Sequence, residues 1–413
     1  MKRALGVFAL IMFTVFVTTS MAVAQEDVRT KVEEIGGQVG GHDEAIKELQ
    51  NDVSALKKIK VSGYLQAQFE KSEKAGGFVA DPYDAKDPVK SRFNLRRSRI
   101  KIAYDGGSTQ MVVQGDFSNA GFSLKDAYLD FSEPTFPMLS ARVGVFNRPN
   151  YEVEYSSSQR ESPERSSVVR ALYPNERDLG FMLTLAPEDL FVLQLAGFNN
   201  TFLGPIRQTS PNFGTEPLYF MARLTKSLTL GDVGLDIGVH GRFGNARANT
   251  GRFVEAENPT TVVDTTGAAG DTYARSWFGV EAQLYYDFLG GMKILGEYIT
   301  GSDVNELSAT GASPVRQREF SGFYVMLVKN IGADWQFAAK YDSYMPNTAI
   351  GDDKVNATGE LAVSTIGVGL HNYSFANVRL TVWYDMIATA TNDRILKEDP
   401  KDNQLTLRAQ YKF

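Results

Sequence analysis

The chain has 413 residues, with 43 Lys and Arg against 49 Asp and Glu, a formal net charge of -6 at pH 7 and no cysteine. The lack of cysteine excludes a disulfide scaffold and thiolate metal sites. The acidic balance makes nucleic acid an unexpected partner. Beyond the first 24 residues, no apolar stretch approaches the length that a transmembrane helix requires.

Residues 1–24 have the organisation of a signal peptide. Lys2 and Arg3 precede an apolar run over residues 5–17, and small residues at 22–24 offer a cleavage site. The run is too short for a comfortable membrane span. We therefore expect an exported protein, which could be periplasmic, secreted or a barrel.

Residues 25–58 follow a helical period. Gly36, Gly37, Gly40 and Gly41 weaken the first half, so the firm helix is expected over residues 43–58. The narrow apolar seam predicts a periplasmic coiled-coil leader, and the alternative is a flexible leader that is amphipathic by accident. The seam consists of Val28, Val32, Ile35, Val39, His42, Ile46, Leu49, Val53 and Leu56.

Residues 59–413 change to a period of two, which is typical of strands with one apolar and one polar face. The pattern predicts sixteen strands. They lie over residues 61–69, 92–104, 109–117, 122–131, 138–146, 178–185, 190–198, 217–225, 233–243, 273–288, 291–299, 317–329, 333–342, 361–370, 374–386 and 403–413.

Short turns alternate with longer polar links along these strands. This sorting is required of an even-stranded antiparallel barrel and is not expected of a soluble sandwich. The one exception is the brief link over residues 118–121. We therefore predict an all-β, sixteen-stranded transmembrane β-barrel, and a barrel of this size leaves an aqueous channel.

The last predicted strand alternates apolar and polar residues up to the carboxyl terminus, with Tyr411 and Phe413 on the apolar side. Outer-membrane barrels end in this way, and the terminal aromatic residue resembles the signal that their barrel-assembly machinery reads. The apolar face would meet outer-membrane lipid and lipopolysaccharide.

The longest link, over residues 147–177, carries five Arg and five Glu. A structureless link of this length is uncommon unless it is functional. It is the third long link, and because the third loop of trimeric porins folds into the lumen, we predict a constriction loop. The other interpretation is a solvated surface loop. The candidate constriction residues are Arg148, Arg160, Glu161, Glu164, Arg165 and Arg170.

The second predicted strand carries a row of cations. Outward Ile100 and Ile102 force Arg97, Arg99 and Lys101 inward, at roughly 7 Å from one another. Rings of Arg or Lys let pores select anions. The alternative is a wall whose charge the loop residues Glu161 and Glu164 merely neutralise. Further inward cations are predicted at Arg142 and Arg408.

The runs RRSRIKIAYDGG, LKDAYLDF, VGVFNRPN and ESPERS, the last leading to RDLG, occur in this order between residues 92 and about 185. In order and spacing they resemble the phosphate-selective porin O and P family. The resemblance implies a trimeric sixteen-stranded channel with an arginine ladder, which Arg97, Arg99 and Lys101 would match. One departure is that no lysine lies between Lys125 and Lys226.

The three histidines do not suggest an enzyme. His42 lies on the leader, His240 points inward on a strand and His371 is placed at a turn. No serine neighbours His240, and the sequence suggests no cluster of His with carboxylates, so neither catalysis, nor a metal, nor a cofactor is predicted.

The sequence therefore predicts a trimeric outer-membrane porin for passive diffusion of small hydrophilic solutes, and the expected solutes are anions such as phosphate. One alternative is a general porin that is non-selective or tolerates cations. Another is a structural outer-membrane protein whose leader is a periplasmic tether.

Overall fold

The computed structural model describes most of the chain from residue 45 onward. The described residues are 26, 29–32, 34, 37, 45–50, 52–75, 77–79, 89–118, 121–174, 176–199, 218–247, 272–287, 290–306, 315–348, 361–391 and 396–413. The chain divides into two units, Met1–Lys60 and Val61–Phe413. In the described part, no helix has both the length and the apolar character needed to cross a bilayer.

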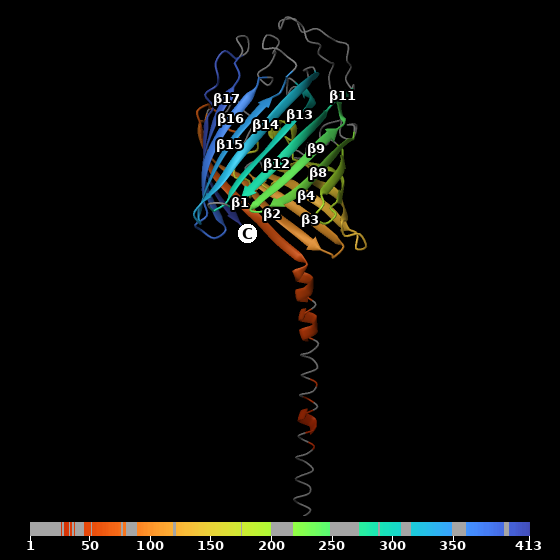
Figure 1. Ribbon diagram of the computed structural model, residues 1–413. Coiled ribbons are helices and arrows are strands. Elements are labelled where there is room, and N and C mark those ends of the chain that lie inside the picture. The colour runs from red at the N-terminus through yellow and green to blue at the C-terminus, as the bar shows by residue number, and fades with distance from the viewer. Residues whose placement is uncertain are drawn as a thin grey trace, which may run out of the picture. The chain divides into compact units, whose positions relative to one another are not determined.

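Sixteen antiparallel strands form a closed barrel (Figure 1). Each strand pairs with its neighbour along the chain, and β1 closes the ring against β18. The barrel strands are β1 (Ile59–Ser72), β2 (Ser91–Asp105), β3 (Thr109–Ser118), β4 (Gly121–Ser132), β5 (Leu139–Asn147), β6 (Arg177–Leu185), β7 (Val192–Phe198), β8 (Tyr219–Leu230), β9 (Val233–Phe243), β12 (Ser276–Tyr286), β13 (Met292–Glu306), β14 (Val315–Ile331), β15 (Trp335–Met345), β16 (Val363–Asn372), β17 (Val378–Thr389) and β18 (Gln404–Lys412). The predicted fold class and strand number are confirmed.

The predicted strand near 273–288 is wrong at its start. Arg275 separates β11 (Thr272–Ala274) from β12, and β11 pairs with β10 (Asn245–Arg247) in a small sheet outside the barrel. Strands β13 and β14 are longer than predicted because their pairing continues to Glu306 and Val315. Polar residues beyond the apolar stretch still form backbone ladders, which hydropathy alone does not reveal.

Turns and links are sorted between the two rims as the sequence predicts. One rim, here called the short-turn rim, carries tight connections such as residues 106–108 and 332–334, and the carboxyl terminus lies at it. The brief connection between β3 and β4 is also real, because Ser118 pairs with Gly121, whose φ of 98° suits glycine.

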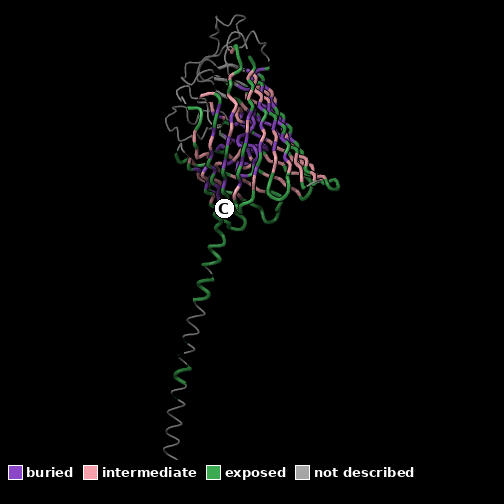
Figure 2. Tube along the Cα trace, turned by 90° about the vertical axis from the view of Figure 1, so that its left-hand side faces the viewer, coloured by how far each residue is buried: buried purple, intermediate pink, exposed green. Residues whose placement is uncertain are grey.

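Buried and exposed residues alternate along the strands (Figure 2). On β2, the outward Ile100, Ile102 and Tyr104 are more than 40% exposed, whereas Arg97 and Arg99 are 3% and 7% exposed. A period-two strand places successive side chains on opposite faces, so the apolar residues cover the outside of the barrel. This arrangement suits a hydrocarbon surrounding.

The barrel interior is not uniformly polar. Two short helices of the link between β5 and β6, α2 (Tyr151–Glu154) and α3 (Ser167–Leu172), pack into it with a cluster of apolar side chains. Gly322 on β14 makes room for α3, because a Cβ at residue 322 would lie only 2.6 Å from the Cβ of Val168. The interior that the strand count predicts to be aqueous is therefore partly filled. The cluster includes Phe146, Leu172, Phe198, Tyr219, Trp277, Phe320 and Tyr324.

In the unit Met1–Lys60, residues 45–50 and 52–57 are helical. The seam residues described there have exposed side chains, with Leu49 at 62% and Val53 at 47%. The predicted signal peptide and the seam positions Val28, Ile35, Val39 and His42 lie outside the described residues. The coiled coil stays a prediction.

Candidate functional site

The link over residues 148–176 enters the barrel and crosses its interior. Near the start of the link, the side chain of Asn150 accepts a hydrogen bond from the backbone N–H of Val153 and so caps α2. Further along, α3 packs against β14, β15 and β16 on another side of the barrel. Most side chains of this link are buried, as expected of a segment enclosed by the barrel wall.

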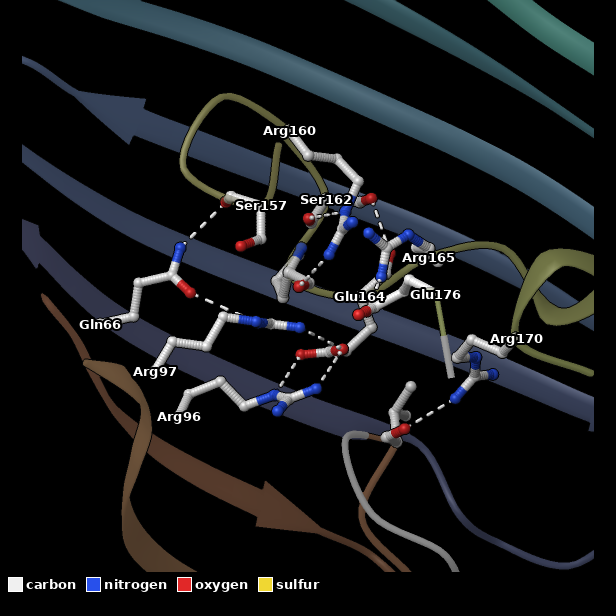
Figure 3. A network of polar contacts seen from close by, with 12 residues as sticks. Gln66, Arg96, Arg97, Ser157, Arg160, Ser162, Glu164, Arg165, Arg170 and Glu176 are labelled. Carbon is white, nitrogen blue, oxygen red and sulfur yellow. Dashed lines mark hydrogen bonds and ion pairs between the residues drawn. The ribbon is translucent and has the colours of Figure 1, made fainter. Parts of the chain in front are cut away.

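Glu164 anchors the link to the barrel wall (Figure 3). It accepts two hydrogen bonds from Arg96, at 2.8 and 2.9 Å, and lies 3.7 Å from Arg97 and 3.3 Å from Arg408. Burial alone would raise the pKa of Glu164, but these three guanidinium groups hold that pKa well below its ordinary value. The carboxylate thus stays charged and ties the link to β2 and β18.

Polar side chains of the wall also bind the backbone of the link. Gln66 donates to the carbonyl of Ser157 at 2.9 Å, and Gln410 donates to that of Ser158 at 2.9 Å. Arg408 donates to the carbonyl of Pro163 at 3.1 Å. Backbone carbonyls buried inside a barrel need such partners, so the link is held by many bonds.

The predicted constriction arginines mostly bind the link or its neighbours. Arg160 is fully buried and donates to the carbonyls of Ser162 and Pro163. Arg165 pairs with Glu176, and Arg170 donates to the carbonyl of Val79 at 2.6 Å. Arg148 lies 3.7 Å from Asp178. Among these four arginines, only Arg165 also lines one of the cavities described below.

Glu161 does not neutralise the cation row on β2. Its carboxylate pairs with Lys293 on β13 at 2.7 Å and accepts a hydrogen bond from Tyr155. The expectation that Glu161 and Glu164 act together is wrong for Glu161, because the link carries the two residues to different parts of the wall. Lys293 was not identified from the sequence, since nothing local marks it as a partner.

The three cations of the β2 row all face inward, but they differ in their partners. Arg97 lies near Glu164 and donates to Gln66 at 3.3 Å. Arg99 pairs with Asp116, its direct neighbour on β3, at 2.9 Å. Within the described residues, no ion pair involves Lys101, which therefore keeps its charge available to the interior.

Lys101 lines a cavity of about 370 Å³ between the wall and the link. Two acidic side chains line the same cavity, Asp126 and Glu154. Six basic side chains line it: Arg99, Lys101, Arg142, Arg165, Arg177 and Lys412. We call this space the basic cavity. More basic than acidic side chains therefore line this space.

Part of the positive charge in the basic cavity is offset by nearby carboxylates. Arg142 makes two hydrogen bonds to Asp130, at 2.7 and 2.9 Å, and its guanidinium lies over the ring of Tyr128. Arg177 binds Asp126 at 2.7 Å. From the sequence, Arg177 was counted only among the arginines of the predicted link, and Lys412 was assigned no role, because only the closed barrel brings them beside Lys101.

A second cavity, of about 350 Å³, has the opposite character. Lys293 is its basic residue, and Glu161, Asp232 and Asp287 line it. We call it the acidic cavity. A larger space of about 800 Å³ borders Glu161, Arg379 and Lys412. The interior thus has basic and acidic sides, which produces a field across the lumen.

The carboxyl-terminal residues close the barrel. Phe413 and Gly63 exchange two backbone hydrogen bonds of 3.0 Å each. The ring of Phe413 lies over Gly63, where a Cβ would come 2.7 Å from it. Tyr411 and Phe413 are both exposed, as expected for the apolar face. Their role in assembly stays a prediction.

The histidine expectations need two corrections. His371 ends up inside β16, fully buried, with Nδ1 2.9 Å from the hydroxyl of Thr381, and is not in a turn. His240, Glu281 and Glu297 form a buried cluster that the sequence did not suggest. The cluster comes from three separate strands, so no local spacing could reveal it.

No family model matches the chain, and no curated protein matches it in sequence. Solved structures do match the fold. The outer membrane channel DcaP of Acinetobacter baumannii matches with a TM-score of 0.57 at 14% identity, over 86% of this chain and 97% of that chain. The anion-selective porin from Comamonas acidovorans matches with a TM-score of 0.55 at 11% identity, over 86% and 99%.

The trimer form of OmpT, an outer membrane protein of Vibrio cholerae, matches with a TM-score of 0.53 at 12% identity, over 86% of this chain and 99% of that chain. This chain has the fold of bacterial outer-membrane porins. At such identities the likeness concerns the fold, and what the channel passes has to be argued from its interior.

Proposed function

We propose that this protein is an outer-membrane channel for the passive diffusion of small hydrophilic solutes, with a preference for anions. The observation that carries the proposal is the basic cavity, where six basic side chains face two acidic ones. The apolar outer face suits outer-membrane lipid and lipopolysaccharide, and a porin of the same fold is described as anion-selective.

Lys101 is the residue to test, because its charge is not paired within the described residues. In planar bilayers with a salt gradient, Lys101→Gln should move the reversal potential toward cations. The shift should be large at about 0.01 M salt and small at about 1 M, since the Debye length falls from about 30 Å to about 3 Å. Lys71→Gln is the matched control, because Lys71 is exposed on β1.

A wild-type channel that prefers cations in dilute salt would contradict the anion preference. So would a reversal potential that Lys101→Gln leaves at the wild-type value. A closed barrel that conducts no ions at all would instead contradict the channel itself.

A general porin that is non-selective or tolerates cations is the second candidate. The acidic cavity favours it, because Glu161, Asp232 and Asp287 would attract cations there. Glu161→Gln separates the two candidates. If cations pass along the acidic side, this change should lower cation permeability, whereas an anion pathway through the basic cavity should be little affected.

Phosphate is the first anion to test, because residues 92 to about 185 resemble the phosphate-selective porin O and P family. A phosphate-binding channel should show chloride currents that inorganic phosphate blocks at concentrations where sulfate does not. Equal effects of the two anions would limit the proposal to anions in general. Because no lysine occurs in the link, the link cannot provide lysine ligands for phosphate. The basic side chains of the basic cavity, such as Lys101 and its arginines, would bind the phosphate instead.

We further propose that the protein is a homotrimer and that its leader associates between subunits. Support comes from the exposed apolar seam at Ile46, Leu49, Val53 and Leu56 and from the trimer form of OmpT. A tether to other periplasmic material would use the same seam. Cross-linking of the intact protein distinguishes the two partners, because a leader bound to another subunit gives a product with the mass of a multiple of this chain, whereas a leader bound to other periplasmic material does not.

A further inference from the structure

We propose that His240, Glu281 and Glu297 form a binding site for one divalent transition-metal ion, with Zn²⁺ as the representative ion. The three residues lie on β9, β12 and β13, three neighbouring strands of the barrel wall. They are 2%, 6% and 4% exposed, and one ligand atom from each lies within 4.8 Å of the others. Imidazole and carboxylate groups are common Zn²⁺ ligands.

Glycine residues allow the histidine to reach the carboxylates. His240 pairs in register with Gly279, and a Cβ at Gly279 would lie 2.2 Å from the Nε2 of His240. The ring therefore lies over Gly279 and brings Nε2 to 2.6 Å from Glu297. Gly238 makes similar room for Glu281, since a Cβ there would lie 2.9 Å from that carboxyl carbon.

The cluster has more negative charge than its neighbours offset. Glu281 and Glu297 are direct cross-strand partners, a placement that is unfavourable for like charges. Arg223 pairs with Glu281 and with Glu154, each at 2.6 Å. Among the described residues, Glu297 makes no ion pair with Arg or Lys. A bound divalent cation would supply the missing positive charge.

Hydrogen bonding within the cluster is incomplete as well. The Oε2 atom of Glu297 and the Nδ1 atom of His240 are buried and have no hydrogen-bond partner in the part of the chain that the structure describes. Buried polar atoms are usually paired, so the free carboxylate oxygen is available to a metal. The side chain of Asn150 donates to Glu297 and lies 3.4 Å from the Nε2 of His240, while its oxygen caps α2. A metal would take the place of that amide N–H.

Calorimetry with Zn²⁺ tests the proposal on the full-length, tag-free protein folded in detergent and freed of metal with a chelator. We expect one ion per chain, and at least tenfold weaker binding in both His240→Gln and Glu297→Gln. His371→Gln is the control, because His371 is a buried barrel histidine outside the cluster. Heat modifiability on a gel reports whether each variant is folded.

X-ray absorption at the zinc edge reports the ligands of Zn²⁺ bound to the wild-type protein, so this measurement does not depend on the folding of any variant. One nitrogen from imidazole with oxygen ligands is the expected environment. Absence of Zn²⁺ binding at about 1 mM, an environment without imidazole, or full affinity in folded His240→Gln would overturn the proposal. None of these outcomes depends on whether the channel prefers anions.

Discussion

The carboxylate of Glu164 accepts a pair of hydrogen bonds from the guanidinium of Arg96, at 2.8 and 2.9 Å. One residue belongs to the link over residues 148–176 and the other to the barrel wall, so this ion pair sets where the link crosses the interior. Paired Arg–carboxylate geometry is directional, which makes it suited to positioning.

We predict that Glu164→Gln destabilises the folded barrel. It would leave Arg96, Arg97 and Arg408 without their shared carboxylate, and breaking a buried ion pair costs about 3–5 kcal/mol. The measurement is the temperature at which the folded band on a gel converts to the unfolded one. Glu161→Gln is a useful comparison because it breaks a single pair with Lys293. Equal transitions in wild type and Glu164→Gln would contradict the anchoring role.

Acid should weaken the same anchor. Arginine partners hold the pKa values of Glu164 and Glu176 well below their ordinary value of 4.5, against the opposing effect of burial. The unfolded chain therefore takes up these protons first as the pH falls. The stability that both groups provide is complete above about pH 4.5 and is lost progressively below it.

The measurement is the unfolding transition between pH 7 and pH 3. Glu164→Gln should reduce the acid-induced loss of stability, because one of the two groups no longer titrates. Glu133→Gln, in an exposed short turn, is the matched control and should behave as the wild type does. A pH dependence that Glu164→Gln leaves unaltered would show that other groups control it.

Deleting Phe413 should lower the amount of folded, heat-modifiable protein in the outer membrane. The deletion removes two backbone hydrogen bonds to Gly63 at the closing seam of the barrel, each worth about 1 kcal/mol. It also removes the proposed signal for the barrel-assembly machinery. Refolding the purified variant in detergent separates these effects, because no machinery is present there. Normal rates and levels of assembly in cells would refute both.

Polar replacement of Leu49 and Val53 should reduce cross-linking between leaders of neighbouring subunits. Both side chains are exposed in the single chain, and the seam gains stability only by burial against a partner. Replacement of Lys47 and Asp52, which lie in the helical residues 45–50 and 52–57 but outside the seam, is the control. Cross-linking that survives the seam replacements unchanged would favour a flexible leader.

The alternation of apolar and polar residues allowed the barrel to be predicted from the sequence. Successive side chains of a strand point to opposite faces, so Ile100 and Ile102 outward require Arg99 and Lys101 inward whatever the rest of the chain does. Strand ends were less accurate, as at β13 and β14, because polar residues beyond the apolar stretch can still join a backbone ladder.

The candidate site depended on contacts between distant residues. Lys293 meets Glu161, and Lys412 joins Lys101 in the basic cavity, only once the barrel is closed and the link lies inside it. His240, Glu281 and Glu297 meet through the register of three strands and the space above Gly279. Where the alternation is regular, the sequence by itself determined which side of a strand faces inward, because that follows from local backbone geometry. It did not place Arg96, which binds the buried Glu164 beside Arg97. Only the tertiary structure decided which inward charges are paired, because pairing depends on strand register and on the path of the link across the interior.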